Sequence, residues 1–108
     1  MNSFPENFEY LKDMYEDDYF PDFLVDKIKN EIVTVVKFLE QGGQSPEDIQ
    51  EKLDSMTINI NNLEDEFEEN DSEIETVARD SIGVTVEEVL KYFKVDIDIE
   101  TAIREREW

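Results

Sequence analysis

The fold is decided by residues 68–93, which read EENDSEIETVARDSIGVTVEEVLKYF. This stretch ends one helical pattern and begins another through a polar turn of about two or three residues, a link that requires two antiparallel helices lying side by side. Ser72 and Glu75 form a capping-box pattern, in which the hydroxyl accepts from the amide three residues on and the carboxylate reaches back. The sequence therefore predicts a helical hairpin around which the rest of the chain packs.

Both helices of the hairpin show apolar residues at spacings of three and four, which is typical of a helix with one buried face. The helix before the turn begins with Ser45 as N-cap and Pro46 in its first turn. Its expected buried positions are Ile49, Leu53, Met56, Ile60, Leu63 and Phe67. The helix after the turn buries Ile74, Ala78, Ile82, Val86, Val89 and Phe93. Gly83 weakens this helix by about 1 kcal/mol, and Thr85 with Glu88 offers a second capping box, so a break between Ile82 and Thr85 stays open.

Another long helix is expected from Pro21 to the glycine pair Gly42-Gly43, which is typical of a helix C-cap. Its buried stripe consists of Leu24, Ile28, Ile32, Val35 and Leu39. At the N-terminus, Ser3 and Pro5 predict a short helix that turns Phe8, Leu11 and either Met14 or Tyr15 inward. Near the C-terminus, Asp98 caps a final helical turn over Ile99 to Arg104. The predicted fold is all-α: one compact bundle, residues 1–108, of three long helices, a short N-terminal helix and a short C-terminal helical turn.

The chain has 108 residues with neither cysteine nor histidine, so it has no disulfides and no Cys/His metal site. Catalytic triads and Cys/His nucleophilic sites are also excluded. The first residues carry no basic segment followed by an apolar run, so we expect no signal peptide. The longest apolar run, near Ile32 to Val36, is far below the ~18 residues of a membrane span. We therefore expect a cytoplasmic protein.

The balance of charge is strongly acidic, with 30 Asp and Glu residues against 10 Lys and Arg and a formal net charge of −20. Such a surface repels the phosphates of nucleic acids and anionic lipids, and it attracts cationic partners. The same acidity also keeps a protein in solution without any partner. We expect neither nucleic-acid nor membrane binding, and a basic protein as the partner.

Four blocks of the sequence carry a resemblance to a known family: Met14–Pro21, Leu24–Lys27, Glu68–Arg79 and Arg106–Trp108. Together they span nearly the whole chain, which resembles a family of small acidic bacterial proteins of unknown function. The resemblance implies an all-helical single domain and implies no activity. Members often carry a Thr-His pair where this chain has Thr57-Ile58, so no role of that histidine transfers here.

The sequence favours a protein that is not an enzyme and that uses no cofactor. Paired carboxylates can act as acid and base, but 30 acidic residues produce such pairs by chance. Asp96, Asp98 and Glu100 alternate like part of a calcium loop, but the glycine and the final glutamate of that loop are missing. The acidic run from Glu64 to Glu69 could bind a divalent ion, although such runs are more often a solvated helix face. For Arg79 we expect charge balance toward Glu75, Glu66 or Asp65.

The candidate partner-binding residues lie in two acidic segments and at the last residue. They are Tyr15, Glu16, Asp17, Asp18, Tyr19 and Asp22 in the first segment, Glu64, Asp65 and Glu68 in the second, and Trp108. Aromatic rings framed by acids make good anchors for a basic partner. The simpler interpretation is that Phe20 and Phe23 belong to the core and that Trp108 plugs the end of the bundle.

The predicted function is binding of a basic protein, in its most specific form as an immunity-type inhibitor that covers a cationic toxin such as a nuclease. Small size, acidity and the missing catalytic residue types motivate this prediction. The first alternative is a scaffold or regulatory subunit, which could be a homodimer, whose acidity serves solubility. The second alternative is an enzyme that uses carboxylates and a divalent metal.

Overall fold

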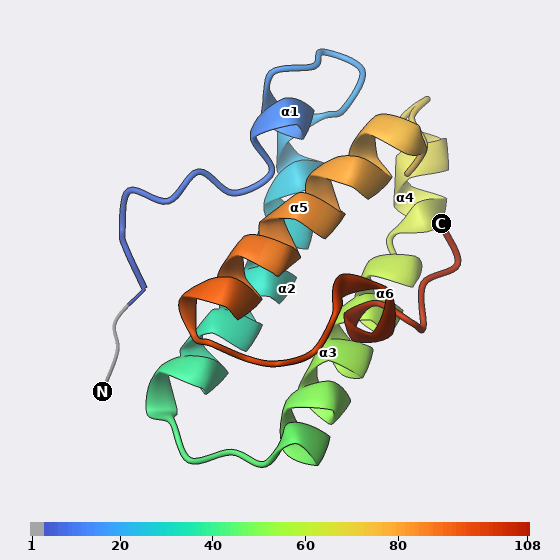
Figure 1. Cartoon of the computed structure of the whole chain (residues 1–108). Coiled ribbons are helices and arrows are strands. Elements are labelled where there is room, and N and C mark those ends of the chain that lie inside the picture. Colours follow the sequence, from blue (N-terminus) through green and yellow to red (C-terminus); the bar gives the residue numbers. More distant parts are fainter. Residues whose placement is uncertain (1–3) are drawn as a thin grey trace.

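The computed structural model describes residues 4–108, and this part of the chain folds into helices without any strand. The helices are α1 (Lys12–Tyr15), α2 (Asp22–Gln41), α3 (Pro46–Asn61), α4 (Glu64–Glu69), α5 (Thr76–Tyr92) and α6 (Ile99–Ala102) (Figure 1). The radius of gyration of the Cα atoms is 13.4 Å, close to the ~13 Å expected of a compact chain of this length. The predicted all-α fold is confirmed.

Helices α2 and α3 form an antiparallel pair (Figure 1), and the glycine pair between them ends α2 as predicted. Gly42 and Gly43 have φ angles of 73° and 79°, a left-handed conformation that favours glycine and ends α2. Ser45 then accepts a hydrogen bond from the amide of Asp48 at 3.1 Å and starts α3. The buried stripe of α2 is also confirmed, because Leu24, Ile28, Ile32, Val35 and Leu39 are all buried.

The predicted third helix is interrupted, which corrects the expectation of one unbroken helix to Phe67. Just after Asn61 the backbone hydrogen bonds shorten from four-residue to three-residue spacing, since the amide of Leu63 donates to the carbonyl of Ile60. The side chain of Asn61 bonds to the C-terminal segment: its amide donates to the Glu105 carbonyl at 2.8 Å, and its oxygen accepts from the Glu107 amide at 3.0 Å. This tertiary contact favours an end at Asn61, and the short helix α4 restores Phe67 to a fully buried position.

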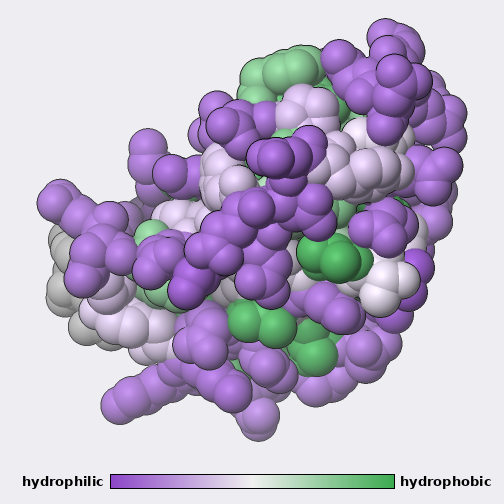
Figure 2. Space-filling model, turned by 90° about the horizontal axis from the view of Figure 1, so that it is seen from above, coloured by the Kyte–Doolittle hydropathy of each residue, from purple (hydrophilic) through white to green (hydrophobic). Residues whose placement is uncertain are grey.

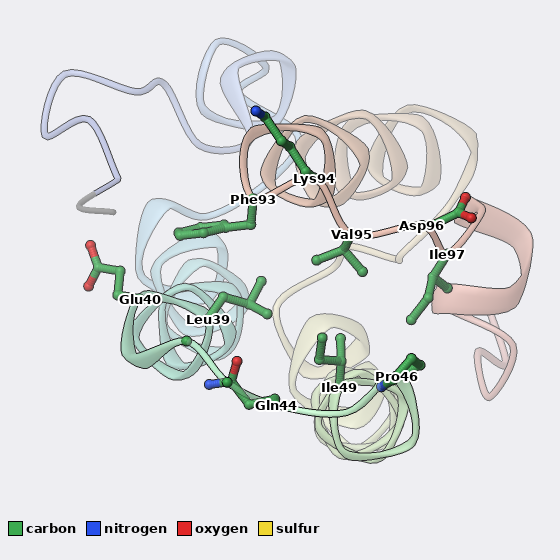
Figure 3. A pocket seen from close by; sticks show the side chains of 12 residues that line it. Leu39, Glu40, Gln44, Pro46, Ile49, Phe93, Lys94, Val95, Asp96 and Ile97 are labelled. Atoms are coloured by element: carbon green, nitrogen blue, oxygen red, sulfur yellow. The ribbon is translucent and has the colours of Figure 1, made fainter. Parts of the chain in front are cut away.

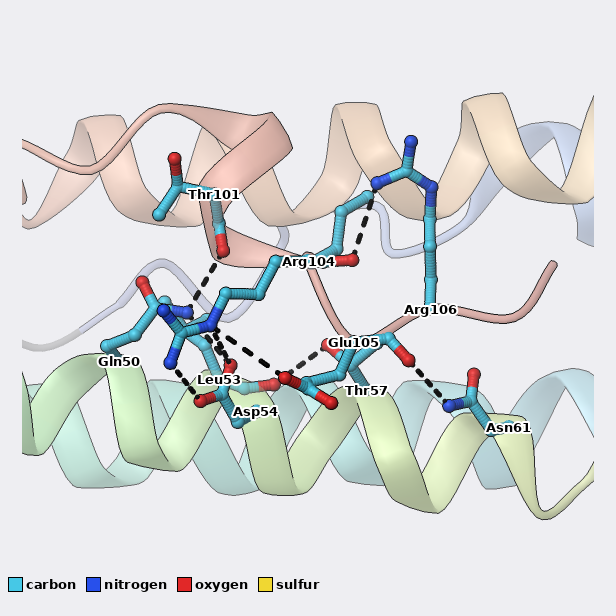
Figure 4. Close-up of polar contacts among 10 residues, drawn as sticks. Gln50, Leu53, Asp54, Thr57, Asn61, Thr101, Arg104, Glu105 and Arg106 are labelled. Atoms are coloured by element: carbon cyan, nitrogen blue, oxygen red, sulfur yellow. Dashed lines mark hydrogen bonds and ion pairs between the residues drawn. The ribbon is translucent and has the colours of Figure 1, made fainter.

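The predicted turn of two or three residues is also wrong, because residues 70–75 separate α4 from α5. Ser72 does not cap α5: its side chain is buried, and the N-cap residue Glu75 makes no side-chain cap hydrogen bond. Asp71 adopts a left-handed φ of 58°, which turns the chain so that Ser72 and Ile74 face the core. The two helices of the predicted hairpin do not pack closely on each other: α3 packs mainly against α2, α5 packs against α1, and α6 contacts both α3 and α5 (Figure 4).

Helix α5 runs unbroken through Gly83, so the break considered near this glycine does not occur. Thr85 is not a cap either, because it is buried in the middle of the helix. Its hydroxyl oxygen accepts a hydrogen bond from the amide of Leu11 at 3.1 Å. Thr85 therefore joins α5 to the N-terminal segment instead of starting a helix.

The N-terminal segment forms a single helical turn, α1, and not the helix predicted from Ser3 and Pro5; Ser3 itself lies outside the described residues. Leu11 precedes α1 in a left-handed conformation with φ 51° and is fully buried, as is Met14. Phe4 packs its ring near Phe8 and Phe93, with centroids 4.7 and 5.8 Å away. This aromatic cluster holds residues 4–11 across the bundle in place of a helix.

The C-terminal segment follows the prediction for its cap. Asp98 accepts hydrogen bonds from the amide and the hydroxyl of Thr101, at 3.2 and 2.8 Å, and starts α6. The carboxylate of Asp98 is therefore the cap of this helix, and the same bonds hold the pKa of Asp98 below its ordinary value. None of the described helices combines the length and the hydropathy that a bilayer-spanning segment needs.

Candidate functional site

The two acidic segments predicted to bind a partner lie at the same end of the bundle. Residues 16–21 connect α1 to α2 there, and α4 with the start of α5 lies beside them (Figure 1). An ion pair of 2.6 Å between Lys27 of α2 and Glu66 of α4 links the two regions. Figure 2 looks onto this end, where hydrophilic side chains cover most of the surface and hydrophobic side chains are exposed between them.

The hydroxyl of Tyr19, in the first acidic segment, is influenced by the charges of carboxylates near the second. Partial desolvation raises the pKa of its hydroxyl, and the carboxylates of Glu73 and Glu75 raise it further. Glu73 and Glu75 belong to the connection before α5, more than fifty residues away in the chain. The fold thus places an exposed aromatic ring beside acids from a distant segment, an arrangement that sequence spacing alone could not show.

The link before α2 has a defined structure of its own. The amide of Tyr19 donates to the Asp17 carboxylate at 2.9 Å, which fixes a local turn. The hydroxyl of Tyr15 donates to Asp26 at 2.5 Å, and its pKa is raised by burial, by this bond and by the charges of Asp26 and Asp22. Tyr15 is therefore half-buried and fixed in place, whereas Glu16, Asp18 and Asp22 are exposed.

The aromatic residues of this region divide into core and surface. Phe20 is buried, as expected, but Phe23 is 50% exposed and Tyr19 is 42% exposed. Phe23 was expected in the core, and this expectation is wrong: the residue precedes the buried pair Leu24 and Val25 and lies off the stripe of α2. Because the sequence already shows that Phe23 lies off this stripe, its exposure could have been predicted from the spacing. We use the name acidic–aromatic face for the exposed rings of Tyr19 and Phe23, the acids Asp17 and Asp18 next to Tyr19 in the chain, and Glu73 and Glu75, whose charges reach Tyr19.

A pocket of about 400 Å³ lies next to this face, between α4, the start of α5 and the C-terminus. It is lined by Glu64, Glu68, Glu73, Ile74, Glu75, Arg79, Glu107 and Trp108. Three predicted partner-binding residues, Glu64, Glu68 and Trp108, therefore come together here. The predicted residue Asp65 is exposed on α4 and does not line the pocket.

Charge in this pocket is poorly balanced. Burial raises the pKa of Glu64, and the carboxylates of Glu107, Glu68 and Asp65 raise it further. Arg79 is the basic residue of the lining, and the ion pair expected with Glu75 does not form among the described residues. Glu75 precedes α5 in an extended conformation, so its side chain is not one helical turn before Arg79.

Trp108 is buried with 9% of its surface exposed, so it packs against the bundle as a plug. Its indole nitrogen has no hydrogen-bond partner among residues 4–108, and the same holds for the Oε1 atom of Glu64. A buried polar group without a partner is costly. Both residues line the acidic pocket, but the two unpartnered atoms themselves are enclosed by the protein.

A second pocket of about 440 Å³ lies at the other end of the bundle (Figure 3). Apolar side chains of Leu39, Ile49, Phe93 and Val95 point toward one another across it, whereas the charged ends of Glu40 and Lys94 point away. Within residues 4–108, no three acidic side chains are grouped in a way that could hold a metal ion.

A family model described as a family of unknown function, DUF5713, matches residues 4–108. No curated protein and no solved structure matches the chain. The match covers every residue that the structure describes, including all four blocks on which the resemblance in the sequence rested. The chain therefore belongs to the family of unknown function DUF5713.

Proposed function

We propose that this protein is a non-enzymatic binding domain that recognises a basic protein through the acidic–aromatic face. The observation that carries the proposal is the exposed ring of Tyr19, whose hydroxyl has its pKa raised by the charges of Glu73 and Glu75 from a distant segment. Exposed aromatic rings act as anchors in protein interfaces, and a surrounding ring of acids steers a basic partner toward them. The net charge of −20 supplies the long-range attraction.

A specific form of this function is inhibition of a cationic toxin, such as a nuclease, in the bacterial cytoplasm. An enzyme that binds nucleic acid needs a positive surface for phosphates. A small domain with a carboxylate-rich face fits over such a surface and competes with the nucleic acid. In this form the protein works by covering the partner and performs no chemistry of its own.

The alternative is a scaffold or regulatory subunit that associates with a second copy of itself. Val77 and Val84 are 38% and 59% exposed and lie seven residues apart on α5, so they share one helix face. A homodimer would bury this face, and light scattering at several protein concentrations tests it. A monomer throughout the concentration range removes this alternative.

The proposal is tested by capturing basic partners from the parent cell lysate at low salt and releasing them at high salt. Association rates with the purified partner are then measured for the variant Asp17→Asn/Asp18→Asn. Asparagine keeps the acceptor that the Tyr19 amide uses, so the local turn survives while two charges are lost. We expect slower association with a weaker salt dependence.

The matched control is Asp48→Asn/Asp96→Asn, two exposed acids near the other end of the bundle. It removes the same charge from a surface that the proposal does not use, so its association rate should stay closer to that of the unchanged protein. Equal rates for the two double variants would show that only overall charge matters and would contradict a localised binding face.

A further inference from the structure

Residues 4–11, which we call the strap, are held to the bundle mainly by their two ends. Of these residues only Phe4 and Leu11 are buried. The amide of Phe4 donates to the carboxylate of Glu40 on α2 at 2.8 Å, and the amide of Leu11 donates to the hydroxyl oxygen of Thr85 on α5 at 3.1 Å. Within the described chain, no backbone–backbone hydrogen bond joins residues 4–10 to another element. The strap is therefore fastened by side chains at two points.

Between these two points the strap packs loosely on α5. It runs beside α5 as an extended trace that leads to α1 (Figure 1). Two pockets, of about 310 and 250 Å³, lie between the strap and α5, and both are lined by Phe8 of the strap and Glu88 of α5. A contact with such gaps gains less van der Waals attraction than a closely packed one. Separating the strap from α5 thus requires less free energy than unfolding a core helix.

Leu11, at the end of the strap, has a strained backbone. Its φ of 51° and ψ of 42° lie in the left-handed region, which is unfavourable for a residue with a Cβ atom. Its buried side chain and the bond of its amide to Thr85 hold it in this conformation. Strain of this kind persists only while the surrounding contacts impose it. Detachment of the strap therefore relieves the strain at Leu11.

Backbone hydrogen bonds connect Leu11 to the acidic–aromatic face. The carbonyl of Leu11 accepts from the amide of Met14, the carbonyl of Met14 accepts from the amide of Asp17, and the carbonyl of Asp17 accepts from the amide of Phe20. Tyr19 lies within the last of these turns, and its own amide bonds to the Asp17 carboxylate. A change of conformation at Leu11 breaks the first bond of this series, and the series ends at the turn that carries Tyr19.

We propose that the strap and the segment that follows it, up to Phe20, open as one unit while the other helices stay folded, and that only the closed unit presents the acidic–aromatic face to the basic partner. The inference rests on the proposed function and adds its regulation. Opening removes the fixed turn at Tyr19, so the apparent dissociation constant of the partner rises in inverse proportion to the closed fraction. By the same linkage, a partner that binds the closed unit stabilises the strap.

Hydrogen exchange of the labelled full chain, followed by NMR, tests the opening without any partner. The amides of Leu11 and Phe20 should share one protection factor, at least about tenfold below that of Leu53 in α3. Low concentrations of urea should reduce the protection of Leu53 steeply and that of Leu11 only slightly, because opening the strap exposes little surface. Exchange of Leu11 that follows Leu53 at every urea concentration, or a Phe20 amide as protected as Leu53, would overturn the proposal.

A substitution outside the unit gives a second test of the same opening. Met56 is buried on α3, a helix that packs against α2 and α6. Met56→Ala destabilises the closed and the open protein equally relative to the unfolded chain. It should therefore lower the protection of Leu53 by about tenfold or more and leave that of Leu11 unchanged. An equal fall at both amides would show that the strap opens only when the whole chain unfolds.

The effect on the partner is measured with Phe4→Ala/Thr85→Val, which removes the ring at one end of the strap and the acceptor at the other. Neither residue belongs to the acidic–aromatic face. The dissociation constant of the captured basic partner should rise by about tenfold or more, whereas the control Met56→Ala should change it by less than about twofold. The protection of Leu53 in the same sample shows that the other helices stay folded, and Phe4→Ala alone serves as a milder variant.

Partner binding to the unchanged protein should in turn raise the protection of the Leu11 amide. If the double variant opens the strap but leaves the dissociation constant unchanged, while Tyr19→Ala/Phe23→Ala weakens binding, the regulation is wrong and the proposed function stands. If the strap opens as expected but no basic protein binds the chain, the proposed function is wrong and the regulation built on it falls, whereas the opening itself remains.

Discussion

Arg104 binds Asp54 through two hydrogen bonds, in which its Nε and Nη2 atoms lie 3.2 and 2.8 Å from the two carboxylate oxygens (Figure 4). Asp54 belongs to α3 and Arg104 to the segment that follows α6. The bond from Gln50 to the Thr101 carbonyl and the bonds of Asn61 to Glu105 and Glu107 lie along the same junction. These contacts attach the C-terminal segment to α3 and thereby bring Trp108 to the acidic pocket.

The first prediction concerns this ion pair. Burial by itself raises the pKa of Asp54, but the hydrogen bonds from Arg104 and Gln50 and the charge of Arg104 outweigh it and hold the pKa below its ordinary value. A carboxylate with a lowered folded pKa adds stability above its unfolded pKa of about 3.9, and this stability is lost as the pH falls through the folded pKa. Asp54→Asn should therefore cost about 1 kcal/mol or less at pH 7, since Arg104 is half-exposed. Urea unfolding should show the cost at pH 7 and little of it below about pH 3; an equal cost at both values would contradict the ion-pair account.

The second prediction concerns the buried bond between Leu11 and Thr85. Thr85→Val keeps the shape of the side chain but leaves the Leu11 amide without an acceptor, which costs about 1–3 kcal/mol for a buried group. Thr34→Val is the control, because Thr34 is exposed on α2 and its hydroxyl bonds only to the Asn30 carbonyl of its own helix. Urea unfolding at pH 7 measures both. Equal costs would mean that the Leu11 contact does not stabilise the fold.

The third prediction compares two neighbouring positions of α4. Phe67 is fully buried, so Phe67→Ala should lower the free energy of unfolding by about 3–5 kcal/mol. Asp65 is exposed, and Asp65→Ala should change it by about 0.5 kcal/mol or less. Thermal and urea unfolding measure the difference. Similar effects from the two substitutions would show that α4 presents a different face to the core.

The fourth prediction concerns the pocket carboxylate Glu64, whose pKa is raised by burial and by Glu107, Glu68 and Asp65. An acid with a raised folded pKa disfavours folding when it is ionised, and this penalty disappears as the pH falls through the folded pKa. Glu64→Gln should therefore stabilise the protein at pH 8 by about a few tenths of a kcal/mol, because solvent screens much of the repulsion. The gain should vanish near pH 4; a gain that persists there would point to a cause other than charge.

Features with a local cause could be predicted from the sequence. The Gly42-Gly43 turn, the Ser45 cap and the Asp98 cap each depend on the conformational preference of one residue or on a bond to an amide three residues away. The helical stripes likewise follow from spacing alone. The resemblance to a family of unknown function was also a property of the residues themselves, and the family match over residues 4–108 confirms it.

The predictions that the structure corrects failed because contacts between distant segments override local sequence patterns. Ser72 and Thr85 carry good capping patterns, but both are buried and start no helix, and Thr85 bonds to the N-terminal segment through the Leu11 amide. Asn61 ends α3 because its side chain bonds residues more than forty positions away. The proximity of Tyr19 to Glu73 and Glu75 and the gathering of Glu64, Glu107 and Trp108 depend on the same long-range packing.

The measurement that tests the central claim most directly is the dissociation constant of the captured basic partner for two apolar double variants. Tyr19→Ala/Phe23→Ala removes the exposed rings of the acidic–aromatic face, and Ile58→Ala/Val84→Ala removes exposed side chains elsewhere. If the face is the binding site, the first variant should weaken binding by about tenfold or more with an unchanged melting temperature, and the second by less than about twofold. Equal dissociation constants for the two variants, or a loss that follows a lowered melting temperature, would contradict the account.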